Sequence, residues 1–502
     1  MATEATQADD PDAYAELMDR YGRISAIGDA SGVLGWDQQV MMPEGGTPAR
    51  SKQLSALSAT SHELLTTDEF GDALEAAESA DLDDGQRAAV REIRRKHERA
   101  VRVDTDLVER ISRTTSEALP VWTQAKDEDD FDSFAPVLDD LVDLKREYAR
   151  QIDPDADPYE VLFADYEPYL GLDTAERVLG RLREELVPLI DAIEESEADL
   201  ADPFSGTYPE ADQEALARDT LDLLGYDWDR GRLDVSAHPF TSGTQFDARI
   251  TTRFDESDPL GALTSTVHEF GHATYALGLP DDSYGTPLGE ARDLSVHESQ
   301  SRLWENHVGR SQPFWNLLAP AVEERLDTDA SPQDFYEAAN RIYPENRIRV
   351  EADELTYHMH IVLRFEIERD LISGDLAVED VPEVWNEKMD EYLGVTPDTD
   401  AEGCLQDIHW SHGSFGYFPT YSLGSVLAAQ LHDAAAAEID DLDGHVEAGE
   451  FDALHEWLTA NVHRHGKRYR TPELVEEATG SEYSADAFLD YANEKFAALY
   501  DL

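Results

Sequence analysis

Helical periodicity constrains the fold of this chain more than any other feature of its sequence. Tyr14, Leu17, Met18, Tyr21 and Ile24 recur at spacings of three and four, which places them on one face of a helix. The same pattern returns in six further segments, at 51–77, 84–118, 174–197, 212–224, 350–372 and 423–437. Loops rich in Gly, Pro and Asp separate these segments. The sequence therefore predicts a mainly α fold.

One segment, 231–254, has the pattern of a β-hairpin instead. Two extended runs flank a Ser/Gly turn, and the second run alternates polar with apolar side chains. Asp247 and Arg249 lie on its polar face, whereas Phe246 and Ile250 lie on its apolar face. We expect this small piece of sheet to lie next to the helix that follows it.

Composition favours a folded chain over a disordered one. Hydrophobic residues make up 41% of the 502 residues and aromatic residues 9%, enough to bury a sizeable core. The sequence contains neither an internal repeat nor a linker long enough to divide it. We therefore expect one folded unit over residues 1–502.

The acidic charge of the chain is extreme, because 109 Asp and Glu residues stand against only 40 Lys and Arg residues. The formal net charge of −69 excludes nucleic acid as a routine partner, since a phosphate backbone is bound through cations. The acids are spread along the chain and do not form an acidic tail. Salt above about 1 M shortens the Debye length to about 3 Å and screens such self-repulsion. We expect a protein from a halophile.

Three absences predict a soluble protein of the cytoplasm. The start of the chain, MATEATQADDPDAY, has neither the basic nor the apolar region of a secretory signal. No apolar run approaches the ~18 residues that a membrane span needs. The single cysteine, Cys404, excludes an internal disulfide and suits a reducing compartment.

The stretch STVHEFGHATYALG, at 265–278, carries two histidines four residues apart. On a helix, His268 and His272 lie one turn apart and can present ring nitrogens to one ion at about 2.0 to 2.1 Å. Glu269 is rotated by about 100° from His268, close enough to hold a water molecule on that ion. Because the chain is rich in His and Glu, the pattern can arise by chance and depends on its context. The apolar neighbours of the histidines are typical of a partly buried helix.

A catalytic zinc ion takes three protein ligands and leaves a fourth position for water. The third ligand must therefore come from another part of the chain. The next helix-like run, DLSVHESQSRLWENHVG, offers His297, Glu298, Glu305 and His307. Spacing alone does not choose among these four.

Six short motifs follow one another along the chain: HPF at 238, DARIT at 247, HEFGH at 268, HESQ at 297, IRVEAD at 348 and GCLQDIHW at 403. With these motifs the chain resembles the carboxypeptidase Taq family, peptidase family M32, over nearly its whole length. The resemblance implies a mainly α, zincin-like metallopeptidase with a small antiparallel β-sheet beside the active-site helix. It also implies a saddle-like or two-lobed body with a deep substrate groove, and a homodimer.

The resemblance assigns the metal site residue by residue. His268, His272 and Glu298 bind the metal, Zn²⁺ or in its place Co²⁺, and Glu269 is the catalytic carboxylate. The activity implied is the removal of single C-terminal residues, with broad specificity, from peptides that have a free C-terminus. A zinc oligopeptidase that cuts internally and an inactive peptide-binding relative are the alternatives. The intact Glu269 disfavours the inactive relative.

A carboxypeptidase needs a fixed cation for the α-carboxylate of its substrate, and arginine provides one as a bidentate fork. Arg349 and Arg249 are the candidates, and we favour Arg349. Each arginine can instead pair with the aspartate of its own motif, Asp353 or Asp247.

Three further side chains are candidates for contact with the substrate or with the oxyanion: His238, His409 and Tyr421. Two of them lie in the motifs, and a tyrosine hydroxyl can donate to an oxyanion. Each can equally be a satisfied buried polar group. The strand at 246–254 can bind the substrate backbone by β-strand addition, or it can simply cap the core.

Overall fold

The structure is a computed structural model that describes residues 11–502. The interpretation of the first residues as lacking a signal therefore falls largely outside the described residues. The α-helices of the first half are α1 (Pro11–Val40), α2 (Thr47–Thr66), α3 (Asp68–Glu78), α4 (Asp84–Arg102), α5 (Thr105–Glu128), α6 (Phe131–Ile152), α7 (Pro158–Phe163), α8 (Leu172–Glu195) and α9 (Glu210–Leu224). Those of the second half are α10 (Pro259–Gly278), α11 (Leu294–Arg302), α12 (Gln312–Leu326), α13 (Pro332–Ala339), α14 (Thr356–Ser373), α15 (Val381–Leu393), α16 (Pro419–Glu438), α17 (Leu442–Ala448), α18 (Asp452–Asn461), α19 (Thr471–Thr479) and α20 (Asp486–Tyr500).

All seven periodic segments of the sequence are largely helical, so the mainly α prediction is confirmed. Three of them are nevertheless not the continuous helices that we predicted. The segment 350–372 begins with a 3-10 turn and a short loop, and α14 starts only at Thr356. The segment 51–77 divides at Thr67, whose backbone is extended and whose hydroxyl accepts a hydrogen bond from the backbone N–H of Phe70. The segment 84–118 divides at Val103, where the backbone is again extended. Capping and backbone geometry, rather than side-chain spacing, set these boundaries.

A small sheet of three strands lies against α10. Its strands are β1 (Gly231–Val235), β2 (Thr241–Thr244) and β3 (Asp247–Thr252), in the order β1-β3-β2. β2 pairs with β3 in antiparallel fashion, but β1 pairs with β3 in parallel, so the sheet is mixed and the predicted simple hairpin is wrong. The residues that we took for a turn form β2 themselves, and the chain crosses from one edge of the sheet to the other between β1 and β2.

The two faces of β3 follow the predicted alternation only in part. Ala248 and Ile250 are fully buried, as predicted for the apolar face. Phe246 is 48% exposed, because it lies in the turn before β3 begins. Thr251 is fully buried although it belongs to the polar set, and its hydroxyl lies within hydrogen-bond distance of Ser236 and Phe240.

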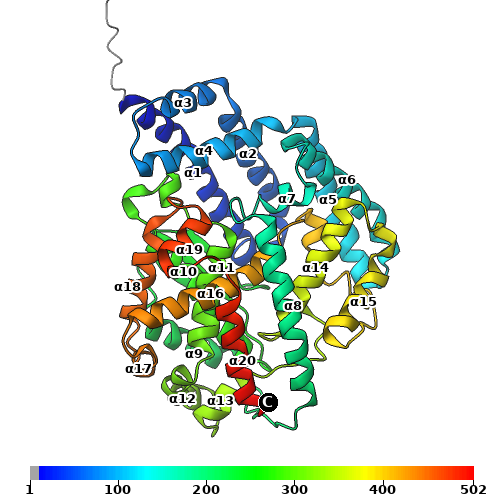
Figure 1. The fold of residues 1–502 in the computed structure, drawn as a ribbon, viewed down its shortest axis with the longest axis vertical. Helices are drawn as coiled ribbons and strands as arrows, with labels where there is room; N and C mark the ends of the chain where they lie inside the picture. The colour runs from blue at the N-terminus through cyan, green and yellow to red at the C-terminus, as the bar shows by residue number, and fades with distance from the viewer. Residues whose placement is uncertain (1–10) are drawn as a thin grey trace, which may run out of the picture.

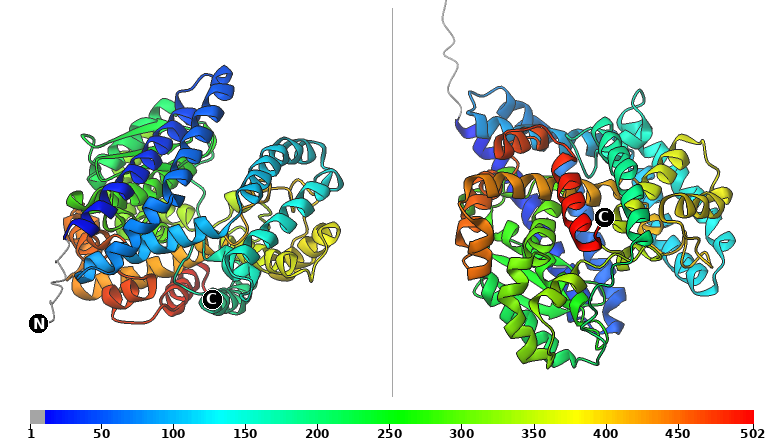
Figure 2. Two further views of the ribbon diagram at one scale, coloured as in Figure 1. Left: turned by 90° about the horizontal axis from the view of Figure 1, so that it is seen from above. Right: turned by 60° about the horizontal axis from the view of Figure 1, so that its bottom comes forward.

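The described chain has one large hydrophobic core and one small one. The large core runs from Val103 to Tyr500, and the small one joins α1 to α3 and α4 through Leu17, Tyr21, Phe70 and Ile93. Helix α11 packs against both α10 and α16, and the three lie together inside the molecule (Figure 1). In the left view of Figure 2, α1 with α2 extends as one arm, and α5, α6 and α15 extend as another. None of the described helices is both long enough and apolar enough to span a membrane.

Candidate active site

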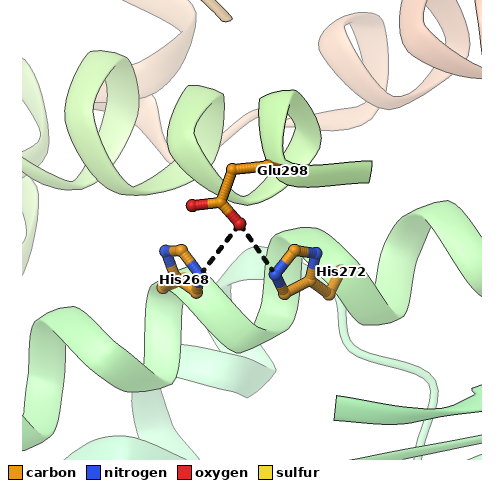
Figure 3. A group of neighbouring side chains, drawn as sticks. All are labelled: His268, His272 and Glu298. Atoms are coloured by element: carbon orange, nitrogen blue, oxygen red, sulfur yellow. Dashed lines mark ion pairs between the residues drawn. The ribbon is translucent and has the colours of Figure 1, made fainter. Parts of the chain in front are cut away.

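The two histidines of the HEFGH motif lie on α10, as predicted. The helix begins where the side chain of Asp258 accepts a hydrogen bond of 2.8 Å from the Gly261 N–H, with Pro259 as the first helical residue. His268 and His272 are one turn apart, and their ring centroids are 4.9 Å from each other. Figure 3 shows both rings turned toward Glu298, which lies on the neighbouring helix α11.

Three ligand atoms converge between these helices. The Oε2 atom of Glu298 is 3.9 Å from Nε2 of His268 and 3.6 Å from Nε2 of His272 (Figure 3). Ligands held at about 2.0 to 2.1 Å around a tetrahedral metal lie roughly 3.3 Å from one another, so these separations are close to those that an ion needs. The three side chains can therefore hold one metal ion.

Hydrogen bonds fix the other nitrogen of each histidine ring. Nδ1 of His268 lies 2.8 Å from Oε2 of Glu305, and Nδ1 of His272 lies 3.1 Å from the backbone carbonyl of His297. Since both acceptors require an N–H at Nδ1, Nε2 is in each ring the atom left to bind a metal. This donor set fits a divalent metal ion.

Opposite charges surround the carboxylates of the site. Arg302 donates to Oε1 of Glu298 at 2.8 Å and to Glu305 at 3.2 Å, and Arg310 pairs with Glu305 at 3.0 Å. Burial alone would raise the pKa of Glu305, but these arginines and His268 hold it well below its usual range. Burial lowers the pKa of His272 well below its usual range, so that ring is neutral and free to bind a metal.

Glu269 lies beside the ligands without joining them. It is 5% exposed. The hydroxyl of Thr241, on β2, lies 2.7 Å from Oε2 of Glu269 and 2.9 Å from the backbone carbonyl oxygen of the same residue. Burial raises the pKa of Glu269 to about 7, against the opposing effects of His268 and Thr241. A carboxyl group with such a pKa can both accept and release a proton near neutral pH.

Two glycines let the helices approach closely enough to assemble the site. A Cβ atom at Gly271, inside the HEFGH motif, would lie 2.5 Å from the backbone of Gln300 and of Ser301 on α11. A Cβ atom at Gly424 on α16 would lie 2.4 Å from the side chain of Glu298. The position of Glu298 thus depends on a missing side chain on each of its two neighbouring helices.

Arg349 is 7% exposed and pairs with Asp407, not with the Asp353 of its own motif. Its guanidinium donates to both oxygens of Asp407 at 2.8 to 3.2 Å, and also to the hydroxyl of Tyr357 at 3.1 Å. Arg364 pairs with the same carboxylate at 2.6 Å. Two guanidinium groups therefore share one carboxylate, which leaves one positive charge without a partner in this buried cluster. The suggested pairing with Asp353 is wrong, because Asp353 instead accepts backbone N–H groups at the start of α14.

The arginine cluster reaches the metal site through an aromatic side chain. The ring of Tyr357 lies 4.8 Å from the guanidinium of Arg302 and 5.8 Å from that of Arg349. Arg302 is the residue that holds Glu298. The cluster that contains Arg349 therefore adjoins the candidate metal ligands.

Arg249 has a different environment. It pairs with Asp247 at 2.6 Å, as the alternative interpretation of its motif suggested, and its guanidinium lies 4.3 Å from the ring centre of Trp36 on α1. It lines a cavity of about 440 Å³ between α1 and the sheet, together with Ser242 and Tyr284. Its guanidinium is already engaged by Asp247 in this cavity.

The remaining predicted residues lie in three different settings. His238 is exposed, on the loop between β1 and β2. The Nδ1 atom of His409 is buried and has no hydrogen-bond partner among the described residues, and burial lowers the pKa of this ring to about 4. Tyr421 lies on α16, where its ring centre is 5.4 Å from the guanidinium of Arg349. Tyr421 therefore lies beside Arg349, as expected if both contact the substrate.

The strand predicted to take up substrate backbone is the wrong one. β3 is the central strand, and both of its edges are already paired, with β1 and β2. A peptide can add only to an edge strand. β2 is such an edge, and its first residue, Thr241, contacts Glu269.

Sequence reasoning missed six residues of the site and misjudged the role of Glu305. The six are Thr241, Asp407, Arg302, Arg310, Tyr357 and Arg364. Thr241 directly follows the HPF motif, and Asp407 lies inside GCLQDIHW, so proximity to motifs was the available signal. Glu305 was one of four possible metal ligands, but its carboxylate instead holds the far nitrogen of His268. His297, another of the four, faces the site with its backbone carbonyl.

A partly buried His/His/Glu cluster with an adjacent carboxylate is the arrangement of a mononuclear metal hydrolase. The family model of the carboxypeptidase Taq (M32) metallopeptidases matches residues 16–496. Thermostable carboxypeptidase 1 of Pyrococcus furiosus is 40% identical over 490 residues, 96% of this chain and 98% of that protein. Carboxypeptidase 1 of Bacillus subtilis is 35% identical over 97% of this chain and 98% of its own length.

Solved structures agree with these sequences. A structure of the Pyrococcus furiosus carboxypeptidase superposes with a TM-score of 0.94 at 38% identity, covering 97% of this chain and 99% of that one. The M32 carboxypeptidase of Deinococcus radiodurans R1 gives a TM-score of 0.94 at 36% identity, with 98% and 100% covered. The chain belongs to the carboxypeptidase Taq (M32) metallopeptidase family. It is a metallocarboxypeptidase, a hydrolase that acts on peptide bonds.

Proposed function

We propose that this enzyme removes single C-terminal residues, with broad specificity, from peptides that have a free C-terminus. His268, His272 and Glu298 hold the metal ion, and Glu269 is the general base and acid. The observation that carries this proposal is the convergence of the three ligand atoms next to a buried carboxyl group. Zinc is the proposed metal, with cobalt as a substitute, because two imidazoles and a carboxylate suit both ions.

The roles of the protein groups follow from their contacts. A divalent metal bound to this cluster supplies a Lewis acid that acidifies water and polarises the scissile carbonyl. Thr241 orients Glu269, which accepts a proton from the attacking water and passes it to the leaving amine. Glu305 keeps the Nδ1 proton on His268, so that Nε2 stays available as a ligand.

Arg349 is the proposed anchor for the substrate's α-carboxylate. Three of its five N–H groups are used by Asp407 and Tyr357, so two remain for an incoming anion. The extra positive charge of the cluster with Arg364 favours that anion. Tyr421, which lies beside Arg349, stays in this proposal with His409, His238 and Arg249 as groups that contact the substrate or the oxyanion. Arg349→Ala should strongly impair cleavage of free-acid peptides and leave the metal content unchanged.

We further propose that the enzyme works as a single folded unit with a deep substrate groove, in a homodimer, in the cytoplasm of a halophile. The charge of −69, distributed along the whole chain, supports the halophilic source, and the single buried cysteine supports a reducing compartment. The groove and the homodimer rest on the resemblance to the family. Sedimentation in low and multimolar KCl tests the dimer and the salt requirement together. A monomer that is equally stable in both salts contradicts both parts.

One experiment separates the proposed reaction from internal cleavage. The same peptide is supplied as free acid and as C-terminal amide, in multimolar KCl, with and without chelator, and the products are read by mass spectrometry. The proposal predicts single-residue losses from the free acid alone, abolished by chelator and restored by Zn²⁺ or Co²⁺. Internal fragments from both forms would contradict it. Glu269→Gln should keep the metal and lose nearly all turnover, and a fully active variant would remove Glu269 from its role.

A further inference from the structure

The helix that carries Glu298 begins without a side-chain cap of its own. α11 starts at Leu294, and Asp293 occupies the preceding position, at which an aspartate usually accepts a backbone N–H of the first turn. Asp293 makes no such bond, because its carboxylate is held by the guanidinium of Arg292 at 2.7 Å and by the hydroxyl of Thr471. The first N–H groups of α11 therefore need acceptors from another part of the chain.

The loop between α7 and α8 provides these acceptors. Oε1 of Glu167 accepts the backbone N–H of Ser295 at 2.5 Å, and the hydroxyl of Ser295 lies 2.7 Å from Oε2 of the same carboxyl group. The carbonyl of Tyr166 accepts the N–H of Leu294 at 3.4 Å. Glu167 is 1% exposed and Ser295 is fully buried, so bulk water does not reach this cap. Because Glu167 and Ser295 are 128 residues apart in the sequence, only the tertiary fold brings the cap to the helix.

The cap lies one turn before the groups that α11 contributes to the metal site. Ser295 and Glu298 are three residues apart, so they are neighbours on the helix surface. The backbone carbonyl of His297 lies 3.1 Å from Nδ1 of His272, and the N–H of His297 donates to the Asp293 carbonyl at 3.0 Å. A shift of the first turn therefore moves both the Glu298 carboxylate and the acceptor that orients the His272 ring.

A carboxamide can replace the carboxyl group of Glu167 in this cap. Burial and the nearby charge of Asp293 raise the pKa of Glu167 well above its usual range, which favours the neutral acid. The amide oxygen of a glutamine accepts the Ser295 N–H, and its NH₂ group donates to the Ser295 hydroxyl oxygen. An apolar side chain instead leaves both groups of Ser295 buried without a partner, which is costly.

We propose that Glu167 is a positioning residue of the metal site, which fixes the first turn of α11 and with it the Glu298 carboxylate and the His297 carbonyl. It acts through Ser295 and not through a contact with the ion. The inference rests on the proposed role of Glu298 as a metal ligand. Since metal sites tolerate displacements of only about 0.5 Å, loss of this cap should weaken metal binding.

Titration of the stripped full-length chain with Co²⁺ tests the proposal. The visible absorption of Co²⁺ depends on the number and geometry of its ligands, and competition with a chelator in about 2 M KCl gives the dissociation constant. Glu167→Ala should raise that constant about tenfold or more and change the spectrum of the saturated protein. Glu167→Met, which fills the same space without an oxygen, should do the same. Glu167→Gln should keep the wild-type spectrum and stay within about threefold of the wild-type constant.

Gln213→Ala is the matched control for a general loss of stability. Gln213 is 3% exposed, and its amide joins α9 to the backbone carbonyls of Tyr208 and Asp255, neither of which belongs to α11. This variant should lower the melting temperature of the stripped protein and leave both the Co²⁺ dissociation constant and the spectrum unchanged.

Two results would overturn the inference. One is a wild-type constant and spectrum in Glu167→Ala and Glu167→Met, and the other is an equal loss of affinity in Glu167→Gln and Glu167→Ala. Glu298→Ala separates this failure from failure of the proposed function. If Glu298→Ala loses Co²⁺ affinity while Glu167→Ala keeps it, the inference alone is wrong, whereas wild-type binding in Glu298→Ala would contradict the ligand set itself.

Discussion

Gly271 is the residue at which the account of the active site can be tested most quantitatively. The variant Gly271→Ala adds one methyl group, whose carbon would lie 2.5 Å from Gln300 O and from Ser301 Cα. Ordinary contact begins near 3.4 Å, so α10 and α11 must separate by about 1 Å. The clash is with backbone, which cannot rotate away as a flexible side chain can.

Separating the helices moves the metal ligands apart, because His268 and His272 lie on α10 and Glu298 lies on α11. Overpacking of this kind costs about 1 to 3 kcal/mol, while alanine regains about 1 kcal/mol of helix propensity, so the free energy of unfolding should fall only modestly. Metal affinity should suffer more, because sites tolerate displacements of only about 0.5 Å. We expect the metal dissociation constant to rise by about 10- to 100-fold.

Competition with a chromophoric chelator measures that constant, and thermal unfolding of the stripped protein measures stability separately. Gly180→Ala on α8 is the matched control, since a Cβ atom there meets nothing within 4 Å. It should leave metal affinity unchanged and stabilise the helix slightly. If Gly271→Ala binds metal as tightly as the wild type, the close approach of the two helices does not set the ligand geometry.

The other predictions concern the surroundings of the site and the response to solvent. Gly424→Ala should push Glu298 through its Cβ and Cγ atoms and weaken metal binding as Gly271→Ala does, which the same chelator competition measures. Glu305→Gln should lower metal affinity about 10- to 100-fold, since it weakens the hold on His268, and should also destabilise the stripped protein, because Arg302 and Arg310 lose the charge of their buried partner. An unchanged metal affinity would show that the hydrogen bond to His268 is dispensable. Burial would raise the pKa of Glu290, but Lys467 and Lys96 lower it to about 2, so its ion pairs stabilise the fold fully above pH 4.5 and lose up to about 3 kcal/mol as the pH falls toward 2. Acid unfolding of Glu290→Gln followed by circular dichroism should therefore depend less steeply on pH than that of the wild type, and equal slopes would refute the assignment. The melting temperature should rise between about 0.2 M and 3 M KCl as the charge of −69 is screened, and a flat response would contradict the halophilic interpretation.

Most of the features of the fold that the sequence predicted correctly were predicted from local periodicity. The buried stripe of α1, with Leu17 and Tyr21, and the helical HEFGH segment needed only the spacing of apolar residues. The breaks at Thr67 and Val103 were missed, since a cap or one extended residue interrupts a helix without changing the apolar pattern. The parallel pairing of β1 with β3 was missed because strand order is decided by the path of the chain and not by alternation.

In the candidate site, likewise, the positions of the motif residues could be predicted from the sequence, whereas contacts that depend on tertiary packing could not. Glu298 and the histidines lie where the motifs indicated, because a four-residue spacing fixes their positions on one helix and the family motif supplies the third ligand. The partner of Arg349 could not be predicted, since Asp407 is 58 residues away and meets it only through tertiary packing. Thr241 is a similar case, because its contact with Glu269 exists only when β2 lies beside α10.

The central claim is that His268, His272 and Glu298 together hold the metal ion beside Glu269. Crystals of Glu269→Gln grown with one equivalent of zinc, measured on both sides of the zinc absorption edge, test it most directly. The account predicts a single dominant anomalous peak within bonding distance of Nε2 of both histidines and of the Glu298 carboxylate. A dominant peak elsewhere, or one that lacks Glu298 among its ligands, would contradict it.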